Sequence, residues 1–318
     1  MDELKSGFIA IAGRPNMGKS TFINAALGRK IAIVSPKAQT TRSRILGICH
    51  HTKGQMIFLD TPGIHATGRN VLNRAMVQTA YESCREVDAV LYFIDAKQGI
   101  LAEDREILAN LPNGSAPIIL VVNKVDLIDR KKLLPLLHSI PLGTGTETAK
   151  GGKRNQHFSD VVPMSALTGE NLERLLEVVL DKLPVGPKYY PDASFSEQPD
   201  SFLAAEIIRE KLFFYLQQEI PYAVAVRVEQ MQPREGSDIL DITAMILVHR
   251  ESQKAIVIGR QGEMMKRVGR AARQELEKLL GTRIFLRLWV KVRKEWFENP
   301  GLLRDLGYPD EDVGKPSR

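Results

Sequence analysis

The sequence predicts two folded domains: an α/β domain with a doubly wound, mostly parallel sheet, followed by a small α+β domain. Three observations predict them. Up to about residue 183, short apolar runs without alternation are separated by helical patterns, as in parallel strands covered on both faces. Four prolines then fall within residues 184–199, which is typical of a linker. Beyond the linker, helices and strands follow in a different order.

The first domain is placed at residues 1–183, and the linker at 184–200. Its strands are predicted from apolar, β-branched runs at Phe8–Ala12, Ile45–Cys49, Met56–Leu59, Ala89–Ile94, Ile118–Val122 and Val161–Val162. The first run is followed by a predicted helix over Lys19–Leu27. Residues 143–152 are rich in Gly and Thr and lack apolar periodicity, so we expect a mobile loop there.

The second domain is placed at residues 201–295, with the order helix, strand, strand, helix, helix, strand. Its predicted elements are helix Phe202–Gln218, strands Tyr222–Gln230 and Ile239–Val248, a short helical turn, loop Gly259–Gly262, helix Glu263–Leu280 and strand Arg283–Val292. Residues 296–318 are assigned to a C-terminal tail, and its polar end at 307–318 is expected to be poorly ordered.

Composition points to an ordinary soluble protein of a reducing compartment. Apolar residues make up 43% of the chain and charged residues 26%, and no apolar run reaches the roughly 18 residues of a membrane span. The N-terminus leads directly into the first strand, without the pattern of a signal peptide. The only cysteines, Cys49 and Cys84, lack metal-site spacing. We therefore expect a cytoplasmic protein.

Positive charge is concentrated in the second domain. Residues 254–294 hold twelve Lys or Arg and three Glu, a charge of +9 that exceeds the +6 of the whole chain. Such clustering indicates a surface for a polyanion, although a solvated helix face would give the same pattern.

A phosphate-binding loop is predicted where the first strand meets the first helix. The sequence there is Gly-Arg-Pro-Asn-Met-Gly-Lys-Ser, which fits the pattern G-x-x-x-x-G-K-[ST]. Its glycines allow backbone N–H groups to surround phosphates, Lys19 supplies a positive charge, and Ser20 can offer its hydroxyl to Mg²⁺. The predicted nucleotide-binding residues of this segment are Gly13, Arg14, Pro15, Asn16, Met17, Gly18, Lys19, Ser20 and Thr21.

A second phosphate-side motif follows the strand Met56–Leu59 and reads Asp60, Thr61, Pro62, Gly63. It lies at the carboxyl edge of the sheet, where ligands of open α/β folds bind. Asp60 is expected to hold Mg²⁺, and Gly63 to donate its N–H to a γ-phosphate. A threonine before this strand could complete the Mg²⁺ shell. We favour Thr41 over Thr40, although a polar loop without this role fits the composition equally well.

Two further segments predict recognition of guanine. Asn123, Lys124 and Asp126 follow the strand Ile118–Val122, and the Asp126 carboxylate can accept hydrogen bonds from the ring N–H and the exocyclic amine of guanine. Adenine would place a lone pair against that carboxylate. A backbone contact to the base is expected from Ser165, Ala166 and Leu167. The ligand is therefore predicted to be GTP or GDP.

Hydrolysis of GTP is predicted to be slow. Ile64 occupies the position after Gly63 where many GTPases have a glutamine that orients the attacking water. Asn16 is a candidate for holding K⁺ against the phosphates, and an ordinary polar loop residue is the alternative. The candidate catalytic residues are Lys19, Asn16, Thr41 and Gly63.

The loop of the second domain has the pattern of a KH domain, in which Gly-x-x-Gly clamps about four unpaired nucleotides. The candidate RNA-binding residues are Ile258, Gly259, Arg260, Gln261, Gly262, Lys266 and Arg267. In the last strand, Phe285 and Trp289 share a face with basic side chains, as in a groove for a single strand. We favour a different interpretation of these two rings, namely packing under a helix.

The whole chain resembles the Era family of bacterial GTPases, which join a GTPase domain to a C-terminal KH domain. The matching motifs are Gly-Arg-Pro-Asn-x-Gly-Lys-Ser at 13–20, Lys-Ala-Gln-Thr-Thr-Arg at 37–42, Asp-Thr-Pro-Gly at 60–63, Asn-Lys-Val-Asp at 123–126, Glu-Ile-Ile-Arg-Glu-Lys-Leu at 206–212 and Leu-Trp-Val-Lys-Val at 288–292. The resemblance implies binding to small-subunit ribosomal RNA near its 3′ end, a role in maturing that subunit, and peripheral attachment to the cytoplasmic face of the inner membrane. Residues 143–156 look like an insertion relative to the family. We expect a monomer.

Two other hypotheses fit parts of the sequence. In one, a GTPase acts on protein or membrane partners and its basic patch meets anionic lipid. In the other, an RNA-binding protein uses its nucleotide site only for structure. Stimulation of GTP hydrolysis by RNA, and measurable turnover itself, would distinguish them.

Overall fold

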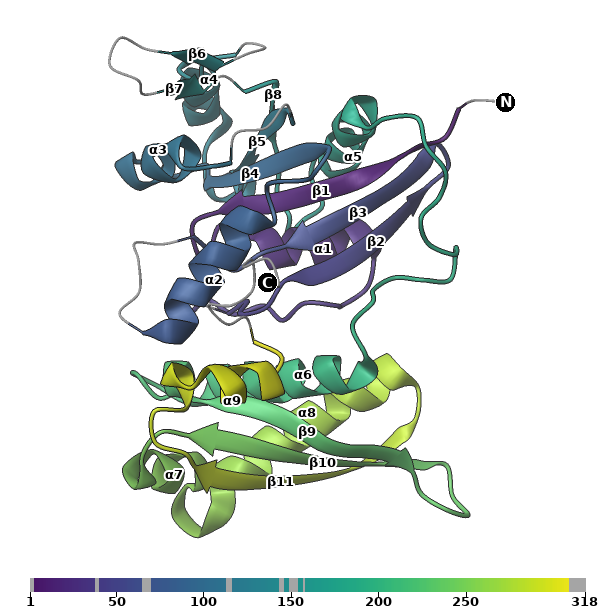
Figure 1. The fold of residues 1–318 in the computed structure, drawn as a ribbon, viewed down its shortest axis with the longest axis vertical. Helices are drawn as coiled ribbons and strands as arrows, with labels where there is room; N and C mark the ends of the chain where they lie inside the picture. Colours follow the sequence, from purple (N-terminus) through teal and green to yellow (C-terminus); the bar gives the residue numbers. More distant parts are fainter. Residues whose placement is uncertain are drawn as a thin grey trace, which may run out of the picture.

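A computed structural model describes residues 3–37, 40–64, 70–112, 116–142, 146–148, 154–156 and 158–308. Two domains lie one above the other along the long axis of the molecule (Figure 1). Within the described residues, no helix is long and apolar enough to cross a membrane.

The first domain is built on a six-stranded sheet with the order β2-β3-β1-β4-β5-β8. Every neighbouring pair is parallel except β2 and β3, which are antiparallel. The strands are β1 (Lys5–Gly13), β2 (Ile45–His51), β3 (Gly54–Asp60), β4 (Ala89–Asp95), β5 (Ile118–Asn123) and β8 (Asp160–Pro163). The predicted α/β fold with a mostly parallel sheet is confirmed.

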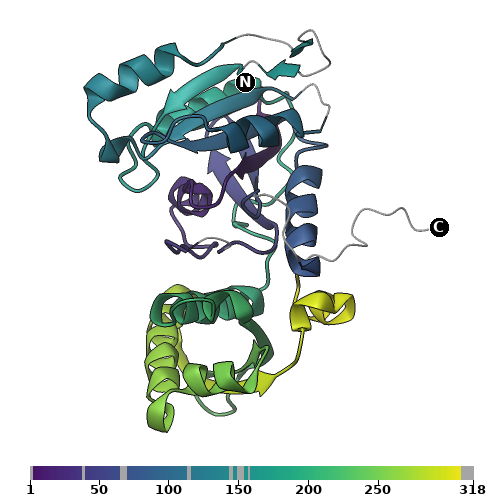
Figure 2. The same cartoon turned by 90° about the vertical axis from the view of Figure 1, so that its left-hand side faces the viewer.

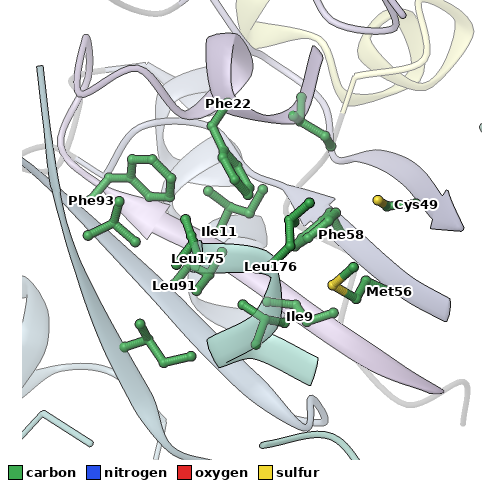
Figure 3. Close-up of a cluster of buried hydrophobic side chains, with 14 of the residues drawn as sticks. Ile9, Ile11, Phe22, Cys49, Met56, Phe58, Leu91, Phe93, Leu175 and Leu176 are labelled. Carbon is green, nitrogen blue, oxygen red and sulfur yellow. The ribbon is translucent and has the colours of Figure 1, made fainter. Parts of the chain in front are cut away.

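Helices cover both faces of this sheet, which explains the continuous apolar character of its strands. One face packs against α1 (Lys19–Leu27) and α5 (Leu172–Lys182), and Figure 3 shows Phe22, Phe58 and Phe93 meeting in that core. The other face packs against α2, α3 and α4. These helices span Val71–Glu82, Ala102–Ala109 and Arg130–His138.

The glycine- and threonine-rich segment contains a short hairpin where we expected only a loop. Strands β6 (Thr146–Thr148) and β7 (Arg154–Gln156) pair antiparallel in a separate two-stranded sheet. Residues 143–145, 149–153 and 157 lie outside the described residues, so the expected mobility of this segment stays a prediction.

The second domain has a three-stranded sheet with the order β11-β10-β9. Strand β9 is antiparallel to β10, whereas β11 is parallel to it. Helices α6, α7 and α8 pack on one face, around Ile242, Ala244 and Ile246. The elements are α6 (Asp200–Tyr215), β9 (Ala225–Pro233), β10 (Ile239–Val248), α7 (Glu251–Ile258), α8 (Glu263–Leu280) and β11 (Arg283–Val292). The predicted small α+β domain and its order of elements are confirmed.

The proline-containing linker has no helix or long strand, but it is pinned to the first domain. The backbone N–H of Ser6 donates to Pro184 O at 3.1 Å, and the N–H of Ile48 donates to Phe195 O at 2.9 Å. The Gln55 side chain accepts from the N–H groups of Tyr189 and Tyr190. These hydrogen bonds hold the linker against strands of the first sheet.

The segment assigned to a tail contains η4 (Trp296–Glu298) and α9 (Pro300–Asp305), which lie between the domains (Figures 1 and 2). Trp296 is fully buried, and its indole N–H donates to Ala223 O at 3.0 Å. A cluster of apolar residues from this segment, from α2 and from the helix-free face of the second sheet surrounds it. Residues 309–318, the rest of the expected disordered end, lie outside the described part.

Arg42 joins the domains through a buried charge. Arg42 is 1% exposed, and its guanidinium donates to Val224 O at 2.6 Å and to Tyr222 O at 2.9 Å. Three aromatic rings, those of Phe213, Trp296 and Tyr308, lie 5.7–5.8 Å from it. A buried charge is stable only when hydrogen bonds replace its water, so Arg42 holds its segment against the second domain.

Trp296→Ala should destabilise the protein by about 3–5 kcal/mol, because it empties a buried site between the two domains. Phe214→Ala is the matched control, since that ring is 74% exposed. Thermal unfolding of both variants tests this. Equal melting temperatures for the two would show that the C-terminal segment adds nothing to stability.

Candidate functional site

The loop between β1 and α1 has the backbone that a phosphate cradle needs. Gly13 and Gly18 have φ angles of 135° and 91°, which residues other than glycine rarely adopt. A Cβ on Gly13 would lie 2.6 Å from Phe93 O, and one on Gly18 would lie 2.2 Å from Asn123 Nδ2. Only glycine therefore fits at either position, as expected of a loop whose N–H groups surround a phosphate.

Lys19 is buried beside this loop. Its ammonium donates to Gly13 O at 3.0 Å and to Arg14 O at 2.9 Å. Burial lowers the pKa of Lys19 to about 8, and Asp60 partly opposes that shift. A bound phosphate would supply the negative charge that this buried cation lacks.

Three side-chain oxygens gather next to Lys19. Ser20 Oγ donates to Asp60 Oδ2 at 2.8 Å, so the 2.8 Å contact between Ser20 Oγ and Thr41 Oγ1 has the Thr41 hydroxyl as donor. Asp60 is fully buried, and its Oδ1 has no hydrogen-bond partner among the described residues. Burial raises the pKa of Asp60 to about 6. Oxygen ligands of this kind suit a hard divalent cation.

The two candidate threonines point in different directions. Thr41 faces Ser20, whereas the Thr40 hydroxyl donates to Lys37 O at 2.7 Å. Thr61 also turns away from the cleft, because its hydroxyl donates to Ile11 O at 2.7 Å. Ala38 and Gln39 of the same motif lie outside the described residues.

The Arg14 side chain points behind the phosphate loop and away from the cleft. Its Nε donates to Asp104 Oδ1 at 2.9 Å, and another nitrogen donates to Gln98 Oε1 at 3.0 Å. Tyr92 Oη donates to the same Asp104 oxygen at 3.0 Å. Arg14 can therefore contact a nucleotide only through its backbone. Sequence reasoning missed Asp104, whose signal is an acid on the apolar face of a helix.

Asn123 connects the phosphate loop to the predicted base-binding segments. Its amide donates to Met17 O at 2.7 Å, and its carbonyl oxygen accepts from Ala166 N–H at 2.9 Å. Ala166 thus lies next to Asn123, although the two are far apart in the sequence. Ser165 is fully buried, and Leu167 is 77% exposed at the rim.

Lys124 and Asp126 flank the base position. Lys124 has a φ of 67°, and its ammonium donates to Asp95 Oδ2 at 2.9 Å, a partner that sequence reasoning missed. Asp126 lies in η1 (Val125–Leu127) and is exposed, and its carboxylate accepts no hydrogen bond from the described residues. It is therefore free to accept hydrogen bonds from a ligand.

A cleft of about 450 Å³ is lined by nine of the nineteen predicted nucleotide-binding residues and by Thr41. On the predicted phosphate side, Pro15 and Gly63 line the cleft, whereas Pro62 does not. The lining residues are Pro15, Asn16, Met17, Gly18, Lys19, Ser20, Thr21, Ile33, Val34, Ser35, Pro36, Thr40, Thr41, Gly63 and Lys124. Asp126 and residues 165–167 lie beyond this lining, on the Asn123 side.

The residue that follows Gly63 cannot orient water. Ile64 is buried in the core, and its backbone N–H donates to Gly13 O at 3.1 Å. Asn16 is exposed, with a φ of 63°, and its amide donates to Pro36 O at 3.0 Å. The carbonyl oxygen of Asn16 is therefore left for another contact.

The loop of the second domain joins α7 to α8 and presents its polar residues to solvent. Gly259 and Gly262 have φ angles of 73° and 78°, and a Cβ on Gly259 would lie 2.7 Å from Met264 Cβ. Arg260 and Gln261 are exposed at the tip. Ile258 precedes the loop, and Lys266 and Arg267 project from the start of α8, with Arg267 4.8 Å from the Tyr215 ring.

Two family models match the chain. One, described as a 50S ribosome-binding GTPase, matches residues 8–124. The other, described as a KH domain, matches residues 219–297. Each match contains one of the two glycine loops.

Full-length relatives and solved structures match both domains together. GTPase Era of Geobacter metallireducens is 46% identical over 96% of this chain and 98% of its own length. GTPase Era of Geotalea daltonii is 47% identical, with the same shares covered. A crystal structure of an Era variant from Aquifex aeolicus bound to GDP and AlF4⁻ is 40% identical, with a TM-score of 0.88 over 96% of this chain and all of that chain. A structure of Era with MgGDPNP and nucleotides 1506–1542 of 16S ribosomal RNA has the same identity and TM-score, covering 96% and 99%.

Proposed function

The chain belongs to the Era family of GTPases, and we propose that it binds and hydrolyses GTP and binds the 3′ region of small-subunit ribosomal RNA. It would thereby assist maturation of the small subunit. The observation that carries the GTPase part is the set of Ser20, Thr41 and Asp60 oxygens beside buried Lys19.

The subunit assignment follows the full-length relatives. The description of the GTPase family model names the large (50S) subunit, and that model matches only the first domain. The match to the Era complex with 16S ribosomal RNA covers 96% of this chain. The longer match includes the KH domain that would make the contact, so it carries more weight.

Mg²⁺ is the proposed cofactor. Ser20, Thr41 and Asp60 would hold it, because their oxygens already converge and the orphaned Asp60 Oδ1 lacks any other partner among the described residues. Such an ion supplies positive charge to the oxygens of the β- and γ-phosphates. The related Era structure contains Mg²⁺ with a GTP analogue.

The residues of this chain would contribute mainly position and charge. Lys19 meets the β- and γ-phosphate oxygens, and Gly63, which lines the cleft, offers its backbone N–H to the γ-phosphate. With Ile64 buried after Gly63, no side chain at that position orients the attacking water. We therefore propose slow intrinsic hydrolysis, with Asn16 as a ligand for K⁺.

RNA is proposed to bind at the Gly259–Gly262 loop, where exposed Arg260, Lys266 and Arg267 provide positive charge. The segment that carries Thr41 reaches the same domain. Arg209 donates to Thr40 O, Arg42 donates into η2 (Pro221–Ala223) and to Val224, and Lys37 donates to Phe213 O. We propose that this segment links the nucleotide state to RNA binding.

The proposed setting is the cytoplasm, where GTP and ribosomes are found. The peripheral membrane attachment and the monomeric state stay predictions.

Asp126→Asn should change the preference of the protein from GTP to XTP. Xanthine carries a carbonyl where guanine has its amine, so it would accept from the asparagine amide. Displacement of a bound labelled nucleotide by unlabelled GTP and by unlabelled XTP measures this preference. An unchanged GTP preference would remove Asp126 from the base site.

Potassium should raise GTP turnover more than sodium does, because the Asn16 carbonyl oxygen would hold K⁺ beside the phosphates. Asn16→Ala should abolish the difference and retain nucleotide binding. Turnover in matched chloride salts, with nucleotide affinity as the control, decides this. If both salts give the same rate, Asn16 is only a loop residue.

Combining Arg260→Asp with Gln261→Asp should weaken RNA binding without unfolding the protein, because both loop glycines remain. Removing one phosphate interaction lowers the slope of log affinity against log salt by about 0.7 for single strands, so the slope should also become shallower. Filter binding over a salt series measures both effects.

The controls for this double variant are its melting curve and its GTP turnover without RNA, and both should equal those of the wild type. A well-folded variant with wild-type RNA affinity would place the RNA site elsewhere on the protein.

A further inference from the structure

Strand β11 presents a row of basic and aromatic side chains on its outward face. That face carries Arg283, Phe285, Arg287, Trp289 and Lys291, and β11 contains no acidic residue. Phe285 is 44% exposed and Trp289 is 38% exposed. The prediction that these rings pack under a helix is therefore wrong.

Phe285 is exposed because the covering layers stop short of it. Helices α6, α7 and α8 pack only on the opposite face of the sheet. On this face, the C-terminal segment packs on Met245 and Leu247 at one end of β10. Phe285 and Arg287 pair with Asp241 and Thr243, nearer the other end of β10, which that segment does not reach.

Each ring is held in place and lies next to a cation. The guanidinium groups of Arg234 and Arg287 lie 4.8 Å and 5.1 Å from the Phe285 ring. Lys291 Nζ lies 5.7 Å from the Trp289 ring, whose indole N–H donates to Glu229 Oε2 at 2.8 Å. Aromatic rings and guanidinium planes of this kind stack on unpaired bases.

The charge of the face is available to a ligand. Arg234 is paired with Asp241, at 2.6 Å, but neither Arg283 nor Arg287 forms an ion pair with any described residue. Four residues of strand place Phe285 and Trp289 about 13 Å apart. Arginines without an ion-pair partner in the described part of the chain thus alternate with two stacking rings, which complements a polyanion that also carries flat bases.

The Gly259–Gly262 loop lies on the opposite side of the same edge strand, because it joins two helices that pack on the other face of β11. Strand β11 is the edge of the sheet, and α7 and α8, which the loop connects, both pack against it (Figure 1). A KH loop clamps only about four nucleotides. A longer unpaired strand that leaves the loop can therefore cross the β11 edge onto the open face.

A membrane surface fits these observations less well than RNA. Rings that insert into a bilayer project from the surface, but Phe285 and Trp289 are both less than half exposed and held by neighbouring side chains. We propose that the open face of β11, formed by Arg283, Phe285, Arg287, Trp289 and Lys291, is a second contact surface for unpaired RNA. The proposal rests on the proposed RNA-binding function of the KH loop.

The test uses the full chain with Phe285→Ala and Arg287→Glu combined, and Arg287→Glu alone in case the double variant does not fold. Arg105→Glu, an equal charge change at an exposed position of α3, is the control. Two RNA probes are needed: one of about five unpaired nucleotides, which the loop alone can hold, and one of about fifteen, which extends past it.

The double variant should lose roughly tenfold in affinity for the long RNA and bind the short RNA as the wild type does. The loop variant, with Arg260→Asp and Gln261→Asp, should lose affinity for both. If the double variant binds both RNAs normally while the loop variant binds neither, the second surface is refuted and the proposed function survives. If the wild type binds neither RNA, the proposed function itself fails, and this inference with it.

Binding to vesicles of phosphatidylcholine with phosphatidylglycerol tests the alternative partner, an anionic membrane surface. Loss of vesicle binding by the double variant, with its affinity for the long RNA unchanged, would overturn the proposal in favour of a membrane surface. Unchanged vesicle binding, together with weakened binding of the long RNA, supports it.

Discussion

The burial of the Arg42 guanidinium is the constraint on which the arrangement of the two domains depends. A charge in this position is tolerated only because carbonyl groups of the second domain, at Tyr222 and Val224, accept its hydrogen bonds. Pulling the domains apart would leave both the charge and the carbonyls without these bonds. Since Thr41 is the preceding residue and contacts Ser20, the metal side of the nucleotide cleft is fixed by the same anchor.

A second connection follows the other phosphate motif. Helix α2 begins a few residues after Gly63, and its Leu72 and Met76 pack in the cluster around Trp296. That cluster also covers part of the sheet face on which Phe285 and Trp289 stay partly exposed. Both chain segments that border the proposed γ-phosphate position therefore lead to the second domain. The C-terminal segment contacts each of them through Trp296.

Sequence patterns predicted the features that depend on residues close together in the chain. The phosphate loop, the strand runs and β10, α8 and β11 follow from glycine spacing and apolar periodicity, and the bounds predicted for those three elements agree with the structure. Tertiary contacts determined the rest. Nothing near Arg14 in the sequence shows that it pairs with Asp104, and the alternation of β11 is the same whichever face the helices cover. The choice of Thr41 likewise needed the contact to Ser20.

The nucleotide and RNA sites are proposed to be linked through the Thr40–Arg42 segment, and linkage is reciprocal. The most direct measurement is the affinity of the full chain for the 3′ region of 16S ribosomal RNA when it is loaded with GDP and when it is loaded with Mg²⁺ and GDPNP. We expect the two RNA affinities to differ by roughly fivefold or more. Adding RNA should change the ratio of GDPNP affinity to GDP affinity by the same factor. The same RNA affinity in both nucleotide states would contradict it.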